Sequence, residues 1–459
     1  MLDRTYGEAR STMYASSNKE KFHRSGPPRS KQRIRRYNGL CGKLREAPDG
    51  RLISSKDVAP TMPRGSRDLY DEVEAYYRHN SAAARQILST IARLSDEVRK
   101  GNAGRPVRIM NFCGTHEWTT THYGIRSLIP KGVELISGPG CPVCVTPASY
   151  VDLCIKLSLE GVRVYTYGDA FKLPTTRRVK GARSLEEAKS LGGDVAVVYS
   201  FLDAMKDAKS SSKKGVFLGI GFETTMPSYS EPIDRKVVPK NLFLLSALRL
   251  TPPAATFALE KVGKVDGVIA PGHVSVITGA SAWAAIADEL HIPTVISGFE
   301  PIDVLISIAG LLRQMANGEH KVEIEYKRAV SWKGNERAMS TMHRVFETVD
   351  SAWRGIGIIP RSGLELREEH SAQDAKKEFG LAEEEADSWR DDLPKRCRCG
   401  EVTLGLIKPT ECSLFLRACN PERPYGPCMV SSEGTCAVWA RYGGGGLADR
   451  VAAEVGVNL

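Results

Sequence analysis

The C-terminal part of the chain carries six of its eleven cysteines within 40 residues, and thiolates are the side chains that hold soft metals. Proline and glycine are frequent there, so the segment can build little apolar core and needs something else to hold it together. The close pair is C-x-C and no histidine lies in the segment, whereas structural zinc sites use paired knuckles. Irregular all-thiolate spacing favours a 4Fe–4S cluster, with zinc or plain thiols as alternatives. The six residues are Cys397, Cys399, Cys412, Cys419, Cys428 and Cys436.

A second cysteine motif, Cys141-Pro142-Val143-Cys144, follows a β-rich run, and Thr146-Pro147 begins a predicted helix just after it. The positive end of a helix lowers the pKa of a nearby thiol, which favours a reversible dithiol/disulfide or a soft-metal ligand. Two buried cysteines that act as small apolar residues are the alternative. The Gly138-Pro139-Gly140 turn favours exposure of the motif and therefore the functional interpretation.

Cys113 also follows a β-rich run, with His116 and Glu117 shortly after it. A thiolate in this setting can bind a soft metal while the imidazole or the carboxylate orients it. It can also be a nucleophile beside a base, or the three residues can be structural. The metal-binding interpretation gains weight if Cys113 lies across a cleft from the C-x-x-C motif.

The elements that must position these residues follow an α/β pattern. Apolar residues from Leu69 to Val98 recur with helical spacing, and from Val107 to about Met315 short β-rich runs alternate with helical segments. Strands that alternate with helices indicate βαβ units and parallel sheets. The predicted strands are Val107–Phe112, Val133–Ser137, Val162–Tyr167, Val195–Tyr199, Val216–Ile220, Val265–Ala270 and Thr294–Ser297.

Nearly every predicted strand is followed at once by a polar or glycine-rich segment. Ligands of open α/β sheets bind beyond the carboxyl ends of the strands, so we expect these loops to converge on one cleft. Four further polar residues in such loops are expected there, each also interpretable as a simple hydrogen-bonding residue: Glu223, His273, Glu300 and Asp303.

Composition divides the chain into four expected parts. Residues 1–65 are a disordered basic extension and 66–235 a first α/β domain with the Cys113 and C-x-x-C loops. Residues 236–330 are a second α/β domain. Residues 331–459 form a C-terminal region that contains the cysteine-rich iron–sulfur module, 397–436. The fold class is thus α/β, with two parallel-sheet domains and a small cysteine-rich domain.

The net charge of +10 is concentrated in the extension, where 15 basic and 6 acidic residues give +9. The other 394 residues carry 49 basic and 48 acidic residues, or +1, which argues against a nucleic-acid partner. The first 30 residues lack an apolar core typical of a secretory signal, and no segment is typical of a membrane span. A cytoplasmic, reducing location is expected, where cysteines are metal ligands or redox thiols rather than structural disulfides.

Taken together, the motifs resemble the HypD family of NiFe-hydrogenase maturation proteins over about residues 67–440. Eight segments carry this resemblance in order: CGTHE at 113–117, GPGCPVCVTP at 138–147, GFETT at 221–225, PGHVS at 271–275, GFEP at 298–301, WRGIG at 353–357, CRCGEV at 397–402 and GPCMVSSEGTC at 426–436.

The resemblance implies an assembly scaffold rather than an ordinary turnover enzyme. Together with a HypC-type chaperone it would hold the Fe(CN)2CO unit before delivery to the hydrogenase large subunit, and a HypE-type protein would donate cyanide. Cys113 would hold this iron with His116 in support, and Cys141 and Cys144 would pass electrons to it.

For the 4Fe–4S cluster the spacing favours Cys397, Cys412, Cys419 and Cys436, with Cys399 and Cys428 as alternates or as a spare thiol pair. A rival interpretation is an iron–sulfur-dependent thiol–disulfide oxidoreductase that acts on a protein substrate without iron at Cys113. A zinc-stabilised nucleic-acid binder that uses the basic extension is a third, weaker one.

Overall fold

The structure is a computed structural model that describes residues 78, 80–381 and 392–443. These residues belong to one compact unit, 66–459. The expected extension, residues 1–65, lies outside the described residues, as does the beginning of the first predicted helix. The rest of that helix is α2 (Ser81–Gly101), whose first turn is capped by the Asn80 side chain accepting from the backbone N–H of Ala83.

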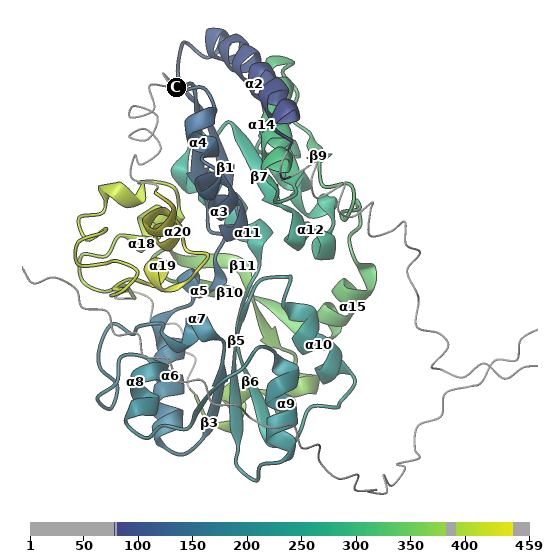
Figure 1. The fold of residues 1–459 in the computed structure, drawn as a ribbon. Coiled ribbons are helices and arrows are strands. Elements are labelled where there is room, and N and C mark those ends of the chain that lie inside the picture. The colour runs from purple at the N-terminus through teal and green to yellow at the C-terminus, as the bar shows by residue number, and fades with distance from the viewer. Residues whose placement is uncertain (1–77, 79, 382–391, 444–459) are drawn as a thin grey trace, which may run out of the picture. The chain divides into compact units, whose positions relative to one another are not determined.

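The first sheet has five strands, all parallel, in the order β2-β1-β7-β8-β9. They are β1 (Val107–Asn111), β2 (Val133–Ser137), β7 (Gly267–Pro271), β8 (Thr294–Ser297) and β9 (Val322–Ile324). Apolar side chains on one face pack against helices α2 and α14, and those on the other face pack against α11 to α13. Figure 1 labels α2, α11, α12 and α14 around the strands of this sheet. These helices are α11 (Thr251–Val262), α12 (Gly272–Thr278), α13 (Ala284–Asp288) and α14 (Pro301–Ala316). Both faces of this sheet are therefore buried, as a parallel sheet requires.

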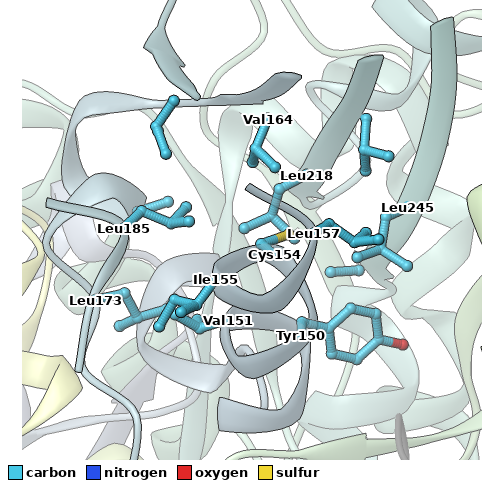
Figure 2. Packing of buried hydrophobic residues seen from close by; sticks show 14 of the residues in the cluster. Tyr150, Val151, Cys154, Ile155, Leu157, Val164, Leu173, Leu185, Leu218 and Leu245 are labelled. Atoms are coloured by element: carbon cyan, nitrogen blue, oxygen red, sulfur yellow. The ribbon is translucent and has the colours of Figure 1, made fainter. Parts of the chain in front are cut away.

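The second sheet has six strands in the order β10-β11-β6-β5-β3-β4, of which β3 to β6 are parallel and β10 and β11 antiparallel. They are β3 (Arg163–Thr166), β4 (Val195–Val197), β5 (Gly215–Gly221), β6 (Leu242–Arg249), β10 (Phe346–Trp353) and β11 (Gly357–Leu366). Figure 2 shows the core on one face, where Tyr150, Val151 and Cys154 of α6 (Ala148–Leu159) pack on the strands. The other face is covered by α9 (Phe201–Lys209), α10 (Met226–Asp234) and α15 (Glu336–Val345).

The expected α/β class is confirmed, but the strands are not divided at residue 235. The chain makes β1 and β2, leaves to build β3 to β6, returns for β7 to β9, and leaves again for β10 and β11. Each sheet thus contains strands from both ranges that we expected to be separate domains. Sequence periodicity identifies a strand but carries no information on its neighbours, which are set by long-range packing.

Beyond the second sheet the chain forms a module of short elements around the C-terminal cysteines, drawn in yellow in Figure 1. Its elements are α18 (Cys399–Thr403), η3 (Pro409–Glu411), α19 (Pro427–Val430) and α20 (Thr435–Tyr442). Among the described residues, no helix combines the length and the apolar character that a membrane span needs. The remaining short elements are α3 (Gly114–His122), α4 (Ile125–Leu128), α5 (Pro142–Val145), α7 (Gly168–Phe171), α8 (Leu185–Ser190), η1 (Ala280–Trp283), η2 (Glu368–Gln373) and α16 (Ala375–Glu378).

Candidate functional site

Cys113 is the second residue after β1 and the N-cap of α3, so its thiol lies at the start of a helix beyond the carboxyl end of the first sheet. The side chain is half-buried. Burial and the nearby Glu433 carboxylate raise the pKa of the Cys113 thiol to about 11, and backbone N–H groups of His116 and Thr115 oppose this rise. The free thiol is therefore protonated at neutral pH, and a bound cation would favour the thiolate.

The C-x-x-C loop passes directly over the backbone of Cys113. The Gly114 N–H donates to the Gly140 carbonyl at 3.1 Å. A Cβ atom at Gly140 would collide with the backbone nitrogen and Cα of Cys113. The glycine of the GPGC motif is therefore required by this close approach, because any side chain would push the two thiol-bearing loops apart.

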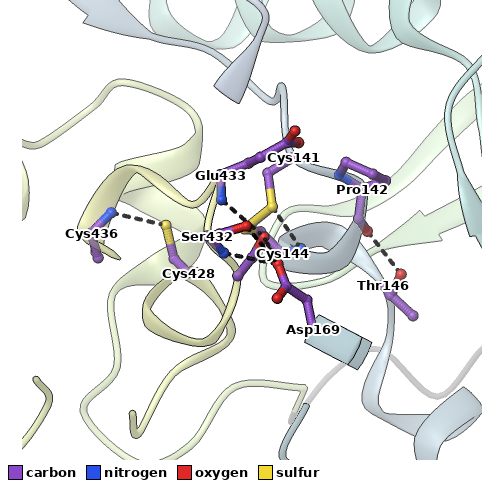
Figure 3. Close-up of a disulfide and its surroundings, with 10 residues drawn as sticks. Cys141, Pro142, Cys144, Thr146, Asp169, Cys428, Ser432, Glu433 and Cys436 are labelled. Carbon is purple, nitrogen blue, oxygen red and sulfur yellow. Dashed lines mark hydrogen bonds between the residues drawn. A yellow bond between two sulfur atoms is a disulfide. The ribbon is translucent and has the colours of Figure 1, made fainter. Parts of the chain in front are cut away.

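Cys141 and Cys144 form a disulfide around the single turn of α5, as Figure 3 shows. Cys141 is the N-cap of this turn, and its Sγ accepts from the backbone N–H of Cys144 at 3.2 Å. Both residues are buried, and both pack against cysteines of the C-terminal module. The structure thus places a disulfide directly beside the C-terminal cysteines.

All six C-terminal cysteines pack in one cluster with the C-x-x-C pair. The ligand atoms of Cys399, Cys428 and Cys436 lie within 4.8 Å of one another, and the sulfurs of Cys397 and Cys399 are 3.2 Å apart. A Cβ at Gly426 would collide with Sγ of both Cys397 and Cys399, so that glycine makes room for sulfur. Buried, converging thiols with no histidine are a donor set that fits an iron–sulfur cluster.

The tightest group differs from the four ligands that the spacing favoured. It contains Cys436 together with Cys399 and Cys428, the two expected alternates. Cys419 lies in a β-bridge with Phe415, and its Sγ accepts from the Tyr425 N–H at 3.4 Å. Spacing along the chain could not rank the six, because the module has little regular structure that would relate spacing to distance.

One small cavity connects the three thiol motifs. Its lining includes Cys113, Cys141, Cys144, Cys428 and Glu433. The wall from the C-terminal module is fixed by Asp169 in α7, which accepts from the Ser432 N–H at 2.9 Å and from the Ser432 hydroxyl at 3.0 Å (Figure 3). Segments from 113, 141–144 and 428–433 therefore meet at one place, as expected for a site that must bring sulfur atoms together.

Glu117 ties the first sheet to the C-terminal module. Its buried carboxylate accepts from Arg126 at 2.8 Å, from Ser137 at 2.7 Å and from Trp439 of α20 at 2.5 Å. Burial alone would raise the pKa of Glu117, but the charge of Arg126 and these hydrogen bonds outweigh burial and lower it. Glu117 is thus an ionised anchor that positions α3.

His116 binds the loop after β8. Its Nε2 donates to the Gly298 carbonyl at 2.8 Å, and its ring stacks on Phe299 with centroids 4.7 Å apart. Burial lowers the pKa of His116 to about 4, so the imidazole is neutral at physiological pH. Its Nδ1 is buried without a partner among the described residues, which leaves one ring nitrogen available to a ligand.

The four other polar residues expected at the cleft are divided between the two sheets. His273 also stacks on Phe299, with ring centroids 3.9 Å apart, so it lies near His116. Glu300 pairs with Arg78 at 2.9 Å, and the buried Asp303 pairs with Arg328. Glu223 instead follows β5 in the second sheet. The expected convergence of all the loops on one cleft is therefore not observed. The shared cavity is lined by the loops after β1 and β2 and by the C-terminal module, and Asp169, after β3 of the second sheet, holds its wall.

Glu223 caps α11. Its carboxylate accepts from the N–H of Thr251 at 2.7 Å and from its hydroxyl at 2.8 Å. Burial raises the pKa of Glu223 to about 7.

Two contributors to the site were missed by our sequence reasoning. Glu433 lies within the GPCMVSSEGTC motif, but only the cysteines of that motif were weighed. Arg354 of the WRGIG motif is fully buried, donates to the backbone carbonyls of Asp392 at 2.8 Å and Pro174 at 2.7 Å, and thereby holds the start of the module. The signal available in the sequence was an arginine between a tryptophan and two glycines in a motif that carried the family resemblance.

The fold and the site define a cysteine-rich α/β protein whose thiols can hold a metal. The HypD family model, described as the hydrogenase formation hypA family, matches residues 83–443. A putative hydrogenase expression/formation protein of Methanocaldococcus jannaschii is 39% identical over 369 residues, which cover 79% of this chain and 98% of that protein.

The hydrogenase maturation factors HypD of Rhodobacter capsulatus and Escherichia coli are similar to a comparable degree. The first is 39% identical over 80% of this chain and 97% of its own length. The second is 38% identical over 78% of this chain and 96% of its own length. The chain belongs to the HypD family of hydrogenase maturation factors.

Proposed function

We propose that this chain is a scaffold on which the Fe(CN)2CO unit of NiFe hydrogenase is assembled. The observation that carries the proposal is the shared cavity of Cys113, Cys141, Cys144 and Cys428. Iron with carbonyl and cyanide ligands is soft and low-spin, so thiolates suit it better than carboxylates. Cys113 is the residue proposed to hold this cargo iron. His116 supports the Cys113 loop through its contacts with Gly298 and Phe299.

Cys141 and Cys144 are proposed as the redox pair of the site. Opening their disulfide takes two electrons and two protons and yields two thiols, and closing it returns them. The packing of both residues against the C-terminal cysteines supports an electron source on that side. A 4Fe–4S cluster, when bound there, would supply single electrons at low potential.

For the cluster we propose Cys397, Cys412, Cys419 and Cys436 as ligands, with Cys399 and Cys428 as a thiol pair between cluster and disulfide. The support is positional. Cys428 lines the cavity that contains the disulfide, and Cys399 belongs to the same close group as Cys428. Thiols at that side are the ones able to exchange with Cys141 or Cys144. A rival ligand set contains the close group of Cys399, Cys428 and Cys436.

The partners proposed are a HypC-type chaperone, a HypE-type cyanide donor and, through the chaperone, the hydrogenase large subunit. Membership of a maturation family supports protein partners in general. No nucleic-acid or membrane partner is proposed, and the site of action is the cytoplasm, where thiols stay reduced between cycles.

The cargo site is tested by Cys113→Ala in the full chain, purified anaerobically with the chaperone. We expect the wild-type complex to show infrared bands of carbonyl and cyanide bound to iron. The variant should lose these bands but keep the visible absorption of its iron–sulfur cluster. Cys154→Ala, which changes a buried thiol in the core of the second sheet, is the matched control. Retention of the carbonyl and cyanide bands by Cys113→Ala would contradict the proposal that Cys113 holds the iron.

A second candidate function is a thiol–disulfide oxidoreductase that acts on a protein substrate. The contact between the Cys141–Cys144 disulfide and the C-terminal cysteines favours it, because this contact does not involve Cys113. The same Cys113→Ala variant separates the two candidates. An oxidoreductase keeps its rate of disulfide reduction with a reduced cluster, whereas the scaffold loses its cargo iron.

The ligand set is tested by comparing Cys399→Ala/Cys428→Ala with Cys412→Ala. Under our proposal the double variant keeps about four iron atoms per chain, as a 4Fe–4S cluster requires, and Cys412→Ala loses them. Loss of iron from the double variant with retention in Cys412→Ala would instead support the close group as ligands.

A further inference from the structure

Two histidines lie side by side at the amino-terminal edge of the first sheet, which is the edge opposite to the thiol site. His291 precedes β8 and His320 precedes β9. These strands are parallel neighbours with Thr294 paired to Val322, so the loops that lead into them are adjacent. The imidazole rings have centroids 4.6 Å apart, and both side chains are exposed to solvent.

The tautomer of the neutral His320 ring is fixed by its backbone partner. Its Nδ1 lies 3.0 Å from the carbonyl oxygen of Ala287, at the C-terminal end of α13. A carbonyl only accepts, so Nδ1 carries the hydrogen and Nε2 keeps its lone pair. Histidines that bind metals usually donate their other ring N–H to a carbonyl in this manner, which fixes the orientation of the ring. His320 is therefore preorganised as a ligand.

The separation of the rings agrees with one shared metal ion. Two imidazoles that bind one tetrahedral ion through bonds of about 2.0–2.1 Å have ring centres about 5 Å apart. We propose that His291 and His320 form a two-imidazole site for a divalent transition ion such as Ni2+, Zn2+ or Cu2+, which are the ions that imidazole suits. It is separate from the cysteines that form the site described above.

The surroundings predict an exchangeable rather than a structural ion. The groove around the pair also contains Glu97, Glu319 and Lys264. Among the described residues, no third cysteine, histidine or carboxylate forms with the pair a group whose ligand atoms all lie within 4.8 Å of one another. Water must therefore complete the coordination, and a site with two protein ligands binds more weakly than the three or four protein ligands typical of zinc enzymes and structural zinc.

The test uses the full chain without a histidine tag and nickel–nitrilotriacetate as the probe. The chelator leaves adjacent coordination positions open, which a pair of imidazoles can fill while the bound chelator prevents capture of the nickel by four thiolates. We expect saturable binding by calorimetry. His291→Gln or His320→Gln should weaken it about 100-fold, because one imidazole loses the gain of two linked ligands.

His343→Gln is the matched control. His343 is an exposed histidine on α15, and this variant keeps all the cysteines of the chain. It should leave the affinity unchanged. A second readout is the NMR spectrum of protein labelled with 13C-histidine. The paramagnetic nickel should broaden the imidazole signals of His291 and His320 before those of the other histidines. Equal binding by wild type and the His291→Gln/His320→Gln double variant, or an equal loss in His343→Gln, would overturn the proposal.

Discussion

Individual residues make the thiol site possible by being small as well as by carrying sulfur. Gly140 lets the C-x-x-C loop touch the backbone of Cys113, and Gly426 leaves space beside Cys397 and Cys399. The carboxylate of Glu117 accepts hydrogen bonds from side chains of three separate segments, at Arg126, Ser137 and Trp439. Residue identity at this site is therefore dictated by close packing around a few polar atoms.

Trp439→Phe tests the Glu117 anchor. It removes the N–H that bonds the carboxylate at 2.5 Å and keeps most of the ring. We expect a loss of about 1–3 kcal/mol in unfolding free energy at pH 7, since a buried carboxylate loses one donor. Denaturant unfolding of the full chain measures this loss.

The pH dependence of this loss follows from the lowered pKa of Glu117. A lowered pKa stabilises the fold above the ordinary pKa of about 4.5, and this stabilisation disappears as the pH falls through the lowered value. The difference between Trp439→Phe and wild type should therefore narrow in acid. Trp332→Phe, at a half-exposed tryptophan, should change stability by less than about 0.5 kcal/mol. An equal effect of the two variants would contradict the anchor.

At the scale of elements, the strands that could be predicted were the short runs rich in β-branched residues followed by turn residues. All seven predicted runs correspond to strands, from β1 to β5 and then β7 and β8. Ser184 is the N-cap of α8, because its hydroxyl accepts from the Glu187 N–H at 3.1 Å. The helix after Thr146 begins one residue later than predicted, with Pro147 as its N-cap.

Two of the missed strands, β6 and β11, lacked those signals. β6 reads LFLLSALR, a run of leucines that favours a helix by propensity and is a strand because both of its faces are buried between helices. β11 contains Pro360 and Gly363, and its register with β10 shifts near Val349. A bulge accommodates the proline there. The bulge depends on pairing with another strand, so the local periodicity of the sequence does not predict it.

Glu223→Gln tests the cap of helix α11 through the pH dependence of stability. The raised pKa of about 7 means that ionisation of Glu223 costs stability. The neutral carboxyl makes its full contribution to stability below its ordinary pKa of about 4.5. As the pH rises towards 7, the unfolding free energy of wild type should fall by about 1.4 kcal/mol per pH unit relative to that of Glu223→Gln. Thermal unfolding between pH 4.5 and 8 measures the difference. Glu260→Gln, exposed on the same helix α11, should show no such trend; a pH-independent difference for Glu223→Gln would contradict the raised pKa.

At the scale of the whole molecule, the site depends on how the C-terminal module is attached to the two-sheet scaffold. Arg354 binds the carbonyl of Asp392, and the module then contacts α7 through Ser432 and α3 through Trp439. A Cβ at Gly400 would collide with the carbonyl of Gly355, so the two loops touch through their backbones. None of these long-range contacts could be foreseen from spacing.

Arg354→Met should weaken this attachment. The change leaves buried Asp392 without its cation and the Pro174 carbonyl without a donor, so we expect a loss of about 3–5 kcal/mol in stability. Limited proteolysis should cut first near the start of the module. Arg337→Met, at an exposed arginine, should be nearly neutral. A protease-resistant Arg354→Met module would contradict this role.

Under the proposed function, removal of iron should affect the module before the sheets. Cysteines form a large part of the buried cluster of the module, so metal bound to their thiols would supply part of its stability. After anaerobic chelation we expect faster amide hydrogen exchange in residues 397–436 and unchanged exchange in strands β5 and β6. Uniform exchange across both regions would show that the module does not depend on metal.

The alternation of the chain between the two sheets sets an order of events during translation. When β1 and Cys113 leave the ribosome, β2 follows at once, but β7, the neighbour on the other side of β1, comes only after the whole run from β3 to β6. The cavity is complete only when Cys428 and Glu433, near the C-terminal end of the described residues, have also been synthesised. Nascent chains therefore carry these thiols before the cavity is complete, and the proposed cargo iron could be received only by a polypeptide whose synthesis has passed Glu433.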